Sequence, residues 1–362
     1  MLKYGLSFLQ SRKLQMAERI YGCYIHVIGR LLKKKPGHRH YAELWGFRWY
    51  CNFRTAFLIR CGGGKRLIPA CSMVSTNGSI ILDLDPYCPD GQSVHPDVIY
   101  DPARCCYMMA ISAFPYKNDA YETPILLFSQ DGTKWSWLGS AAVPVSPIPA
   151  HKLGYHSDPA LLLRQNELYL FDRKVIIHRD GTAAISIDRY QWEQEWKYCG
   201  TVYSAAASWD NHELLLSPSM IDYLGSVHCW YCEKIYGRYE VRHLVFDGNW
   251  NVQFIESCEI KGLKASEYVW HLDICEGSGK LYMAADIKKD GQHSIWLMHS
   301  SDGGATWEKS TMLVSSGTGF SEKSVYRGSI VLKDSALTLY YSGRNNSEYW
   351  QTARIDFERI PK

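Results

Sequence analysis

The chain has 362 residues and a formal net charge of +3, and hydrophobic residues make up 46% of it. This composition excludes a disordered chain, and the balanced charge gives no reason to expect a nucleic-acid partner. Aromatic residues are abundant, with 25 tyrosines and 13 tryptophans, and such residues favour β-sheet packing. We therefore expect a folded protein rich in sheet that does not bind nucleic acid.

The first 35 residues have the pattern of a basic amphipathic helix, in which leucine, isoleucine and tyrosine alternate with lysine and arginine. Such a helix suits an anionic membrane surface, or it packs on the rest of the protein or on a partner subunit. No apolar stretch reaches the roughly 20 residues that a membrane span needs. We predict a basic helix and extension over residues 1–65, in a cytoplasmic protein that is free or peripheral on the inner membrane face.

The chain contains twelve cysteines, yet its first residues do not have the pattern of a secretory signal peptide. Cys105 and Cys106 lie in a strand pattern, as do Cys229 and Cys232. No second Cys-x-x-Cys pair follows at the spacing of a zinc ribbon. We expect these cysteines to be reduced and to behave as buried thiols.

Five short segments recur along the chain at intervals of about 55 to 61 residues. Each is followed by a second run of β-forming residues, and Gly, Asp, Asn and Pro separate the runs. A repeat of this kind is typical of β-propeller blades. The sequence predicts an all-β fold, a five-bladed β-propeller over residues 66–362 with an N-terminal helical extension. The five segments are His95–Ile99, His156–Ala160, Leu216–Met220, His271–Cys275 and Tyr326–Ile330.

The fifth repeat ends one strand short, after the run Trp350–Phe357. A closed propeller can complete its last blade with a strand from the other end of the chain. Two segments, Arg66–Val74 and Ser79–Leu84, have the composition of such a strand. We assign no structure to residues 36–65.

Four repeats carry a turn motif after their second strand pattern. Ser300–Trp307 matches the full Ser-x-Asp-x-Gly-x-Thr-Trp form of the Asp-box, and Ser129–Trp135 is one residue shorter. Aspartate and glycine make a tight hairpin, and the tryptophan fills the gap between strands. We place this motif at the outer hairpin of a blade and give it no catalytic role.

The first strand of a propeller blade runs along the central channel, so the start of each segment is predicted to face one mouth of that channel. A channel whose lining had only a structural role would be expected to carry small apolar residues, because a buried unpaired charge costs several kcal/mol. Three aspartates close together would separate their pKa values, an arrangement that acid–base chemistry on a glycosidic bond uses. The predicted ring consists of His95, Asp97, His156, Asp158, Ser217, His271, Asp273, Tyr326 and Arg327.

Asp97, and Asp158-Pro159 followed by an apolar strand and Asn166–Tyr169, resemble the blade-opening motifs of the five-bladed glycoside hydrolases. These are the arabinanase and β-xylosidase group (family 43) and the invertase and levansucrase group, and the resemblance covers roughly residues 94–345. It implies a glycoside hydrolase or transglycosylase in which Asp97 is the general base and Asp158 the orienting carboxylate. The third segment lacks the Glu-Gly-Pro motif that carries the family's general acid, so Glu122 or Asp273 is expected in that role, with a slight preference for Glu122.

The expected substrate is an oligo- or polysaccharide of bacterial surface type, or its precursor. The Asp-box also resembles that of the six-bladed sialidases, of whose site residues only a Tyr-Arg pair is present. Two other functions stay open: a non-catalytic glycan-binding or assembly propeller, and a polysaccharide lyase with a histidine base beside an arginine. We expect no cofactor and assign no metal ligand, although a divalent ion on the axis is a competing interpretation. Substrate binding is assigned to His95, His156, His271, Arg327, Tyr326, Arg173 and Ser217.

Overall fold

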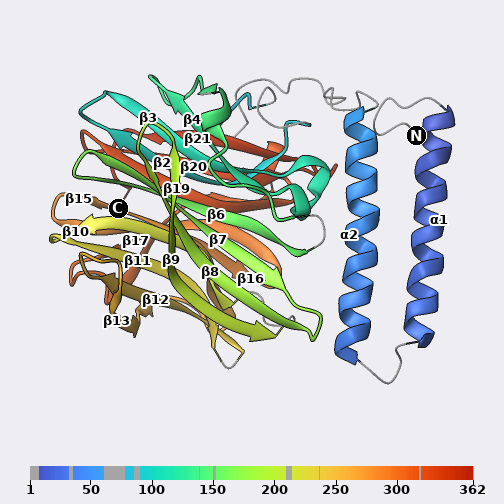
Figure 1. The fold of residues 1–362 in the computed structure, drawn as a ribbon. Helices are drawn as coiled ribbons and strands as arrows, with labels where there is room; N and C mark the ends of the chain where they lie inside the picture. Colours follow the sequence, from blue (N-terminus) through green and yellow to red (C-terminus); the bar gives the residue numbers. More distant parts are fainter. Residues whose placement is uncertain are drawn as a thin grey trace.

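The protein is described by a computed structural model that covers residues 8–31, 36–60, 78–84, 90–137, 139–149, 152–208, 214–235, 237–317 and 319–361. Its strands form five sheets arranged around a common axis, and two helices lie to one side (Figure 1). The predicted five-bladed β-propeller with an N-terminal helical extension is confirmed.

Four of the five blades are antiparallel sheets of four strands, blade four has a fifth strand, and the strand that comes first in the described part of each repeat lies innermost. Blade one consists of β2 (Ser93–Asp101), β3 (Cys106–Ala113), β4 (Thr123–Ser129) and β5 (Ser136–Trp137). Blade two consists of β6 (Leu153–Arg164), β7 (Glu167–Ile177), β8 (Thr182–Trp192) and β9 (Trp196–Ser208). Blade three consists of β10 (Leu216–Tyr223), β11 (Ser226–Ile235), β12 (Arg238–Phe246) and β13 (Val252–Ser257). Blade four consists of β15 (Glu267–Gly277), β16 (Lys280–Lys289), β17 (Gln292–Ser300) and β18 (Thr306–Ser315), with β14 (Glu259–Lys261) added parallel to β18.

Blade five is built from both ends of the propeller. It contains β19 (Ser324–Lys333), β20 (Ala336–Arg344) and β21 (Trp350–Phe357), and β1 (Ile80–Ile81) pairs with β21 as the fourth strand. The amide of Leu82 extends this pairing by donating to the carbonyl of Thr352 at 2.9 Å. The closure predicted from Ser79–Leu84 is confirmed, and the other candidate strand lies outside the described residues.

Apolar side chains from facing sheets fill the spaces between blades, because the strands alternate their side chains between the two faces of each sheet. The turn Ser300–Trp307 joins β17 to β18, and the indole of Trp307 is fully buried between blades three and four. Its Nε1 donates to the carbonyl of Gly304 at 2.9 Å. Gly304 has φ +91°, and a Cβ there would lie 2.4 Å from the ring of Trp230, so glycine is required. This turn holds two blades together at the outer part of the fold.

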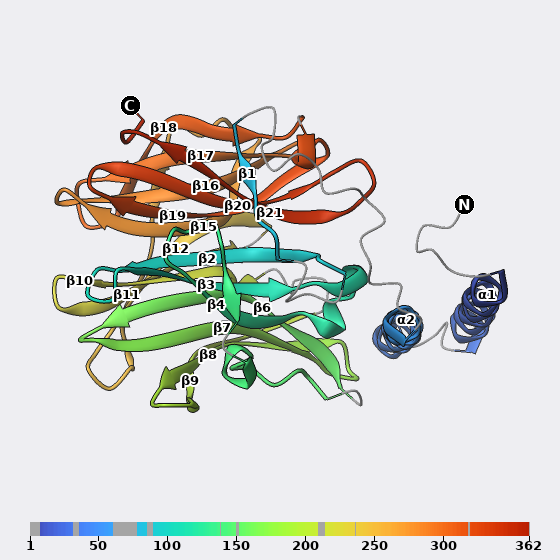
Figure 2. The same cartoon turned by 90° about the horizontal axis from the view of Figure 1, so that it is seen from above.

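The two helices, α1 (Phe8–Leu31) and α2 (Pro36–Arg60), form a hairpin, and α2 lies between α1 and the propeller (Figures 1 and 2). Helix α1 falls within the helix predicted for the first 35 residues, whereas α2 was not predicted. A buried guanidinium, that of Arg48, anchors α2 by donating to the carbonyl of Gly154 at 2.7 Å. Thr55 accepts a hydrogen bond from the side chain of Asn118 at 3.0 Å. Helix α2 is therefore attached to the start of β6 and to the loop that precedes β4.

Neither helix in the described part of the chain is long and apolar enough to cross a membrane. The nine cysteines among the described residues are all free. Cys106, Cys229 and Cys232 are buried, while Cys105 is exposed at a turn.

Candidate functional site

The innermost strand of every blade carries an irregularity near its start, where the pairing with the second strand shifts register. A β-bulge of this kind bends the strand and redirects a side chain, and bulges are common beside active sites. Four residues at these positions adopt the left-handed conformation, which is strained for a residue other than glycine. They are His95 (φ 58°), Asp158 (φ 48°), Ser217 (φ 50°) and Arg327 (φ 26°).

Two residues further along four of the five inner strands, a second ring of polar side chains bonds each of these strands to the inner strand of the next blade. The Oδ2 atom of Asp97 accepts from the amide of Leu161 at 2.7 Å, and that of Asp273 accepts from the amide of Ile330 at 2.9 Å. Serine hydroxyls replace aspartate in blades three and five: Ser219 Oγ accepts from the amide of Ile274 at 2.9 Å, and Ser329 Oγ from that of Val98 at 2.8 Å. The polar residues of this ring join adjacent blades.

The two rings correct the alignment made from sequence. Asp158 occupies the same structural position as His95 and not that of Asp97, whose counterpart in blade two is Ala160. The alignment from sequence therefore placed the blade-two segment two residues out of register with that of blade one. It placed the segments of blades three and five one residue out of register. The cause is physical: equivalent positions are defined by hydrogen bonds between blades across a bulge, and matching aspartates by type does not detect the bulge.

One cavity, of about 280 Å³, opens at the His95 end of the channel. This volume is just below the roughly 300–1,000 Å³ that small-molecule sites occupy. Aromatic side chains form part of its wall, and the indole of Trp270 donates to the hydroxyl of Tyr326 at 3.3 Å. The polar lining includes His95, Glu122, Asp158, Arg173 and His271, and the aromatic lining includes Phe114, Tyr155, Trp270, Tyr326 and Trp350.

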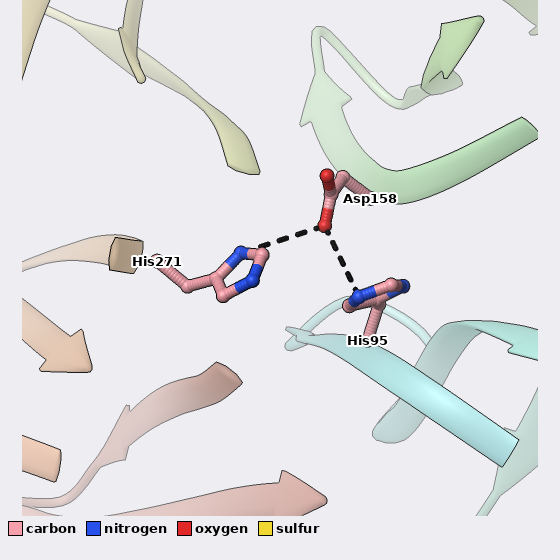
Figure 3. Close-up of side chains that lie close together, drawn as sticks. All are labelled: His95, Asp158 and His271. Atoms are coloured by element: carbon pink, nitrogen blue, oxygen red, sulfur yellow. Dashed lines mark ion pairs between the residues drawn. The ribbon is translucent and has the colours of Figure 1, made fainter. Parts of the chain in front are cut away.

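Three polar side chains from three different blades point toward one another in this cavity (Figure 3). The Oδ1 atom of Asp158 lies 3.6 Å from His95 Nε2 and 3.6 Å from His271 Nδ1. The other nitrogen of His95, Nδ1, lies 2.9 Å from Oε1 of Glu122, which immediately precedes β4. All four side chains are buried. The predicted convergence of His95, Asp158 and His271 therefore occurs, and Glu122 belongs to the same site.

The electrostatic environment separates the two carboxyl groups. Burial acts to raise the pKa of Asp158, but the adjacent imidazoles and two arginines outweigh it and hold this pKa well below its usual range. Arg327 Nη1 lies 3.3 Å from Oδ1 of Asp158, and Arg173 Nη1 lies 3.9 Å from Oδ2. Burial raises the pKa of Glu122, and His95 offsets only part of that effect. Asp158 is thus a fixed anion, whereas Glu122 is the carboxyl group that can exchange a proton.

Asp97 and Asp273 face a different cavity, of about 810 Å³, on the opposite side of the ring of inter-blade hydrogen bonds. The guanidinium of Arg327 lies between the two layers, because its Nη2 is 3.7 Å from Oδ1 of Asp97 while its Nη1 contacts Asp158. Burial and the charge of Asp273 raise the pKa of Asp97 well above its usual range. This corrects the expectation that all three aspartates share one mouth. The larger cavity is lined mainly by strand residues, and its two buried carboxylates already accept hydrogen bonds from the fold.

The remaining predicted residues lie in three different settings. His156 does not line the small cavity, since its Nδ1 contacts Asp172 on the neighbouring strand in a buried pair. The hydroxyl of Ser217 contacts Nδ1 of His271 beside the cavity. Tyr326 and Arg173 form part of the cavity wall, as expected for residues near a substrate.

Apart from Tyr326, the aromatic residues of the site were not predicted from the sequence. Tyr155 and Trp270 directly precede two of the aligned segments, and Trp350 begins the last strand pattern. Their positions next to the segments were the available signal. A repeat search that extended each segment by one residue toward the N-terminus would have included the first two.

One group of side chains in the described residues has the types and spacing to hold a metal ion. It consists of His95, Asp158 and His271, whose candidate ligand atoms all lie within 4.8 Å of one another. Two imidazoles and one carboxylate suit a divalent transition metal better than calcium, which prefers oxygen ligands.

Neither a protein-family model nor a curated protein sequence matches this chain. Solved structures with the same fold do. An N-acetylgalactosamine deacetylase from F. plautii, in complex with blood group B trisaccharide, is 15% identical with a TM-score of 0.61, covering 74% of this chain and 90% of that one. A xylan β-1,4-xylosidase from Bacillus halodurans C-125 is 15% identical with a TM-score of 0.56, covering 74% of this chain and 53% of that one.

A GH43 endo-arabinanase from Bacillus licheniformis is 13% identical with a TM-score of 0.52, covering 74% of this chain and 94% of that one. At these identities the comparison establishes the fold. The resemblance to the five-bladed propeller of the arabinanases and xylosidases, expected from the blade-opening segments, is confirmed at that level.

Proposed function

We propose that this chain is a carbohydrate-active hydrolase that binds an oligo- or polysaccharide in the cavity around Glu122. The observation that carries the proposal is the position of two buried carboxyl groups, Glu122 and Asp158, on either side of His95 in a small aromatic-lined cavity at the propeller axis. Active sites commonly place two carboxyl groups in environments that separate their protonation states.

Glu122 is the proton-transfer group in this proposal. Its raised pKa brings it closer to neutral pH, where a general acid or base is most effective. Asp158 stays ionised, because the charged groups around it, among them Arg327 and Arg173, favour its anionic form. Arg173, at the wall of the cavity, is positioned to bind a substrate oxygen or carboxylate.

The substrate class is supported by the aromatic lining and by the comparisons. Trp270 and Trp350 present rings on which the apolar face of a sugar can stack. The proteins that share the fold include a deacetylase bound to a trisaccharide, a xylosidase and an arabinanase. The small cavity favours a terminal sugar unit over the interior of a long chain.

Asp97 is not used in this proposal, although the family resemblance suggested it as general base. Its carboxylate accepts from the amide of Leu161, and Arg327 stands between it and the small cavity. A glycan-binding propeller without catalysis is the alternative, because Asp158, the second buried carboxyl group of the site, is paired with two arginines.

The experiment is a hydrolysis assay on a panel of neutral and acidic oligosaccharides, with and without acyl substituents, in which new reducing ends and released acids are both measured. We expect turnover by the natural chain and a loss of about 100-fold or more in Glu122→Gln, the usual contribution of a proton-transfer group. Asp222→Asn is the matched control, because Asp222 is a half-exposed carboxylate at the opposite cavity. Full activity in Glu122→Gln would show that the site is misassigned, and binding without turnover would favour the glycan-binding alternative.

The helical hairpin supports a peripheral location at an anionic membrane surface. Apolar side chains are exposed on both helices, and Leu31 and Trp49 are 73% and 46% exposed. Exposed basic residues accompany them on α1, among them Arg12, Lys13 and Arg19. Such a combination of exposed apolar and basic side chains binds anionic lipid.

A further inference from the structure

We propose that His95, Asp158 and His271 bind one divalent transition-metal cation, and that a water molecule on this cation is the nucleophile of the proposed hydrolysis. The three ligands come from β2, β6 and β15, and their side chains are buried, that of His95 being 9% exposed and the other two 1% (Figure 3). The inference rests on the proposed function for its chemistry, and on the geometry of the three side chains for the site itself.

The distances among the three groups fit a metal site better than a hydrogen-bonded cluster. Oδ1 of Asp158 is 3.6 Å from one nitrogen of each imidazole, beyond the 2.7–3.2 Å typical of N–H···O hydrogen bonds. Metal bonds of about 2.1 Å that meet at a tetrahedral angle place two ligand atoms about 3.4 Å apart. A cation between these groups therefore requires only a small adjustment of the side chains.

The groups around the ligands provide the second observation. Metal-binding histidines usually direct their other ring nitrogen to a carboxylate or another polar group, which fixes the orientation of the ring. The far nitrogen of His95, Nδ1, lies 2.9 Å from Glu122, while Nε2 faces Asp158. In His271 the hydroxyl of Ser217 contacts Nδ1, and Nε2 is a buried polar atom with no hydrogen-bond partner among the described residues. The nitrogen of His271 that lies 3.6 Å from Asp158 is therefore Nδ1, and the unpartnered Nε2 is a second nitrogen of this buried ring, costly to leave without a ligand.

The cation would supply what the carboxyl groups of the cavity lack. Asp158 is neutralised by Arg173 and Arg327, so it is a weak base for activating water. Three protein ligands leave a coordination position open, and a water bound there to zinc ionises near neutral pH. In the balanced reaction, the bound water gives one proton to Glu122 and its oxygen forms a bond to the substrate carbon. The bond from that carbon to the leaving group breaks, and the leaving group takes the proton from Glu122.

The first test uses the cation alone, without any sugar. The full chain is stripped with a chelator and titrated with Zn²⁺ by calorimetry and with Co²⁺ by visible absorption, which reports nitrogen and oxygen coordination. We expect one equivalent bound by the natural chain. His95→Gln and His271→Gln should each weaken the affinity by more than about 100-fold, and Glu122→Gln by about 10–100-fold, the usual cost of losing a second-shell partner.

His299→Gln is the matched control, because this histidine is on β17, away from the inner strand of blade four, is about one-third exposed and pairs with Glu308. It should bind cations like the natural chain. Circular dichroism confirms that each variant is folded, and the cation should raise the melting temperature of the natural chain but not that of His271→Gln. The site is refuted if the folded natural chain binds no stoichiometric cation, or if both histidine variants bind as tightly as the control.

The inference and the proposed function fail in different ways. If the stripped chain hydrolyses a sugar substrate as fast as the chain reloaded with Zn²⁺, the cation has no catalytic role and the proposed function stands. If one cation binds at the three residues but no substrate on the panel is turned over, the metal site stands and the proposed function is wrong.

Discussion

Replacing Asp273 with alanine tests whether the deeper ring of polar residues is structural. The side chain is buried, and it accepts hydrogen bonds from the hydroxyl of Ser219 at 2.8 Å and from the amide of Ile330 at 2.9 Å. It therefore links the inner strand of blade four to those of blades three and five. Alanine removes both acceptors and leaves two buried donors.

The magnitude follows from those two donors. A buried donor that loses its partner costs about 1–3 kcal/mol, so Asp273→Ala should lower the free energy of unfolding by about 2–6 kcal/mol. This is a large part of the roughly 5–15 kcal/mol that keeps a domain folded. With a denaturant slope of about 3 kcal/mol per molar urea, the midpoint of unfolding should fall by about 1–2 M.

The assay is equilibrium unfolding in urea, followed by tryptophan fluorescence. Asp222→Ala is the control, since it removes a half-exposed carboxylate at the same cavity, 3.1 Å from Arg164, and should cost about 0–1 kcal/mol. Equal midpoints for the two variants would refute the structural role. If Asp273→Ala kept its midpoint but lost catalytic turnover, the role of general acid considered for Asp273 from the sequence would be the better explanation.

Three further predictions concern other parts of the molecule. Burial lowers the pKa of His243 to about 4, so the unfolded chain takes up a proton at higher pH than the folded chain does. The free energy of unfolding should therefore decline as the pH falls from about 6.5 to about 4. In urea titrations above and below this range, His243→Gln should show a smaller decline, whereas a variant of the exposed His178 should match the natural chain. Trp307→Ala should lower the free energy of unfolding by about 3–5 kcal/mol. Met312→Ala, at an exposed position of the same strand, should change it by less than about 0.5 kcal/mol. Equal urea midpoints for the two variants would contradict the packing role of Trp307. In vesicle sedimentation, the chain should bind phosphatidylserine vesicles more tightly than phosphatidylcholine vesicles, and Trp49→Glu should weaken that binding. Unchanged binding in this variant would exclude the helical hairpin as the membrane contact.

Much of the fold was determined by local signals in the sequence. Turn residues and alternating apolar runs at a repeat of about 55–61 residues predicted five blades, because each blade is one supersecondary unit that recurs with its own hairpins. The missing strand in the last repeat predicted closure by Ser79–Leu84, which the pairing of Ile80 and Ile81 with β21 confirms. Helix α2 was not predicted, because aromatic and basic residues alternate along it without one clear apolar face, and its position depends on contacts such as that of Arg48 with Gly154.

The membership of the candidate site was decided only by the tertiary structure. The sequence placed His95, Asp158 and His271 at the channel, since each opens an inner strand. It also placed Asp97 and Asp273 with them, because aspartates in similar segments are indistinguishable until the bulges and the hydrogen bonds between blades define which positions are equivalent. A shift of two residues along one inner strand is enough to move a carboxylate from one end of the channel to the other, and only contacts between distant segments determine that shift.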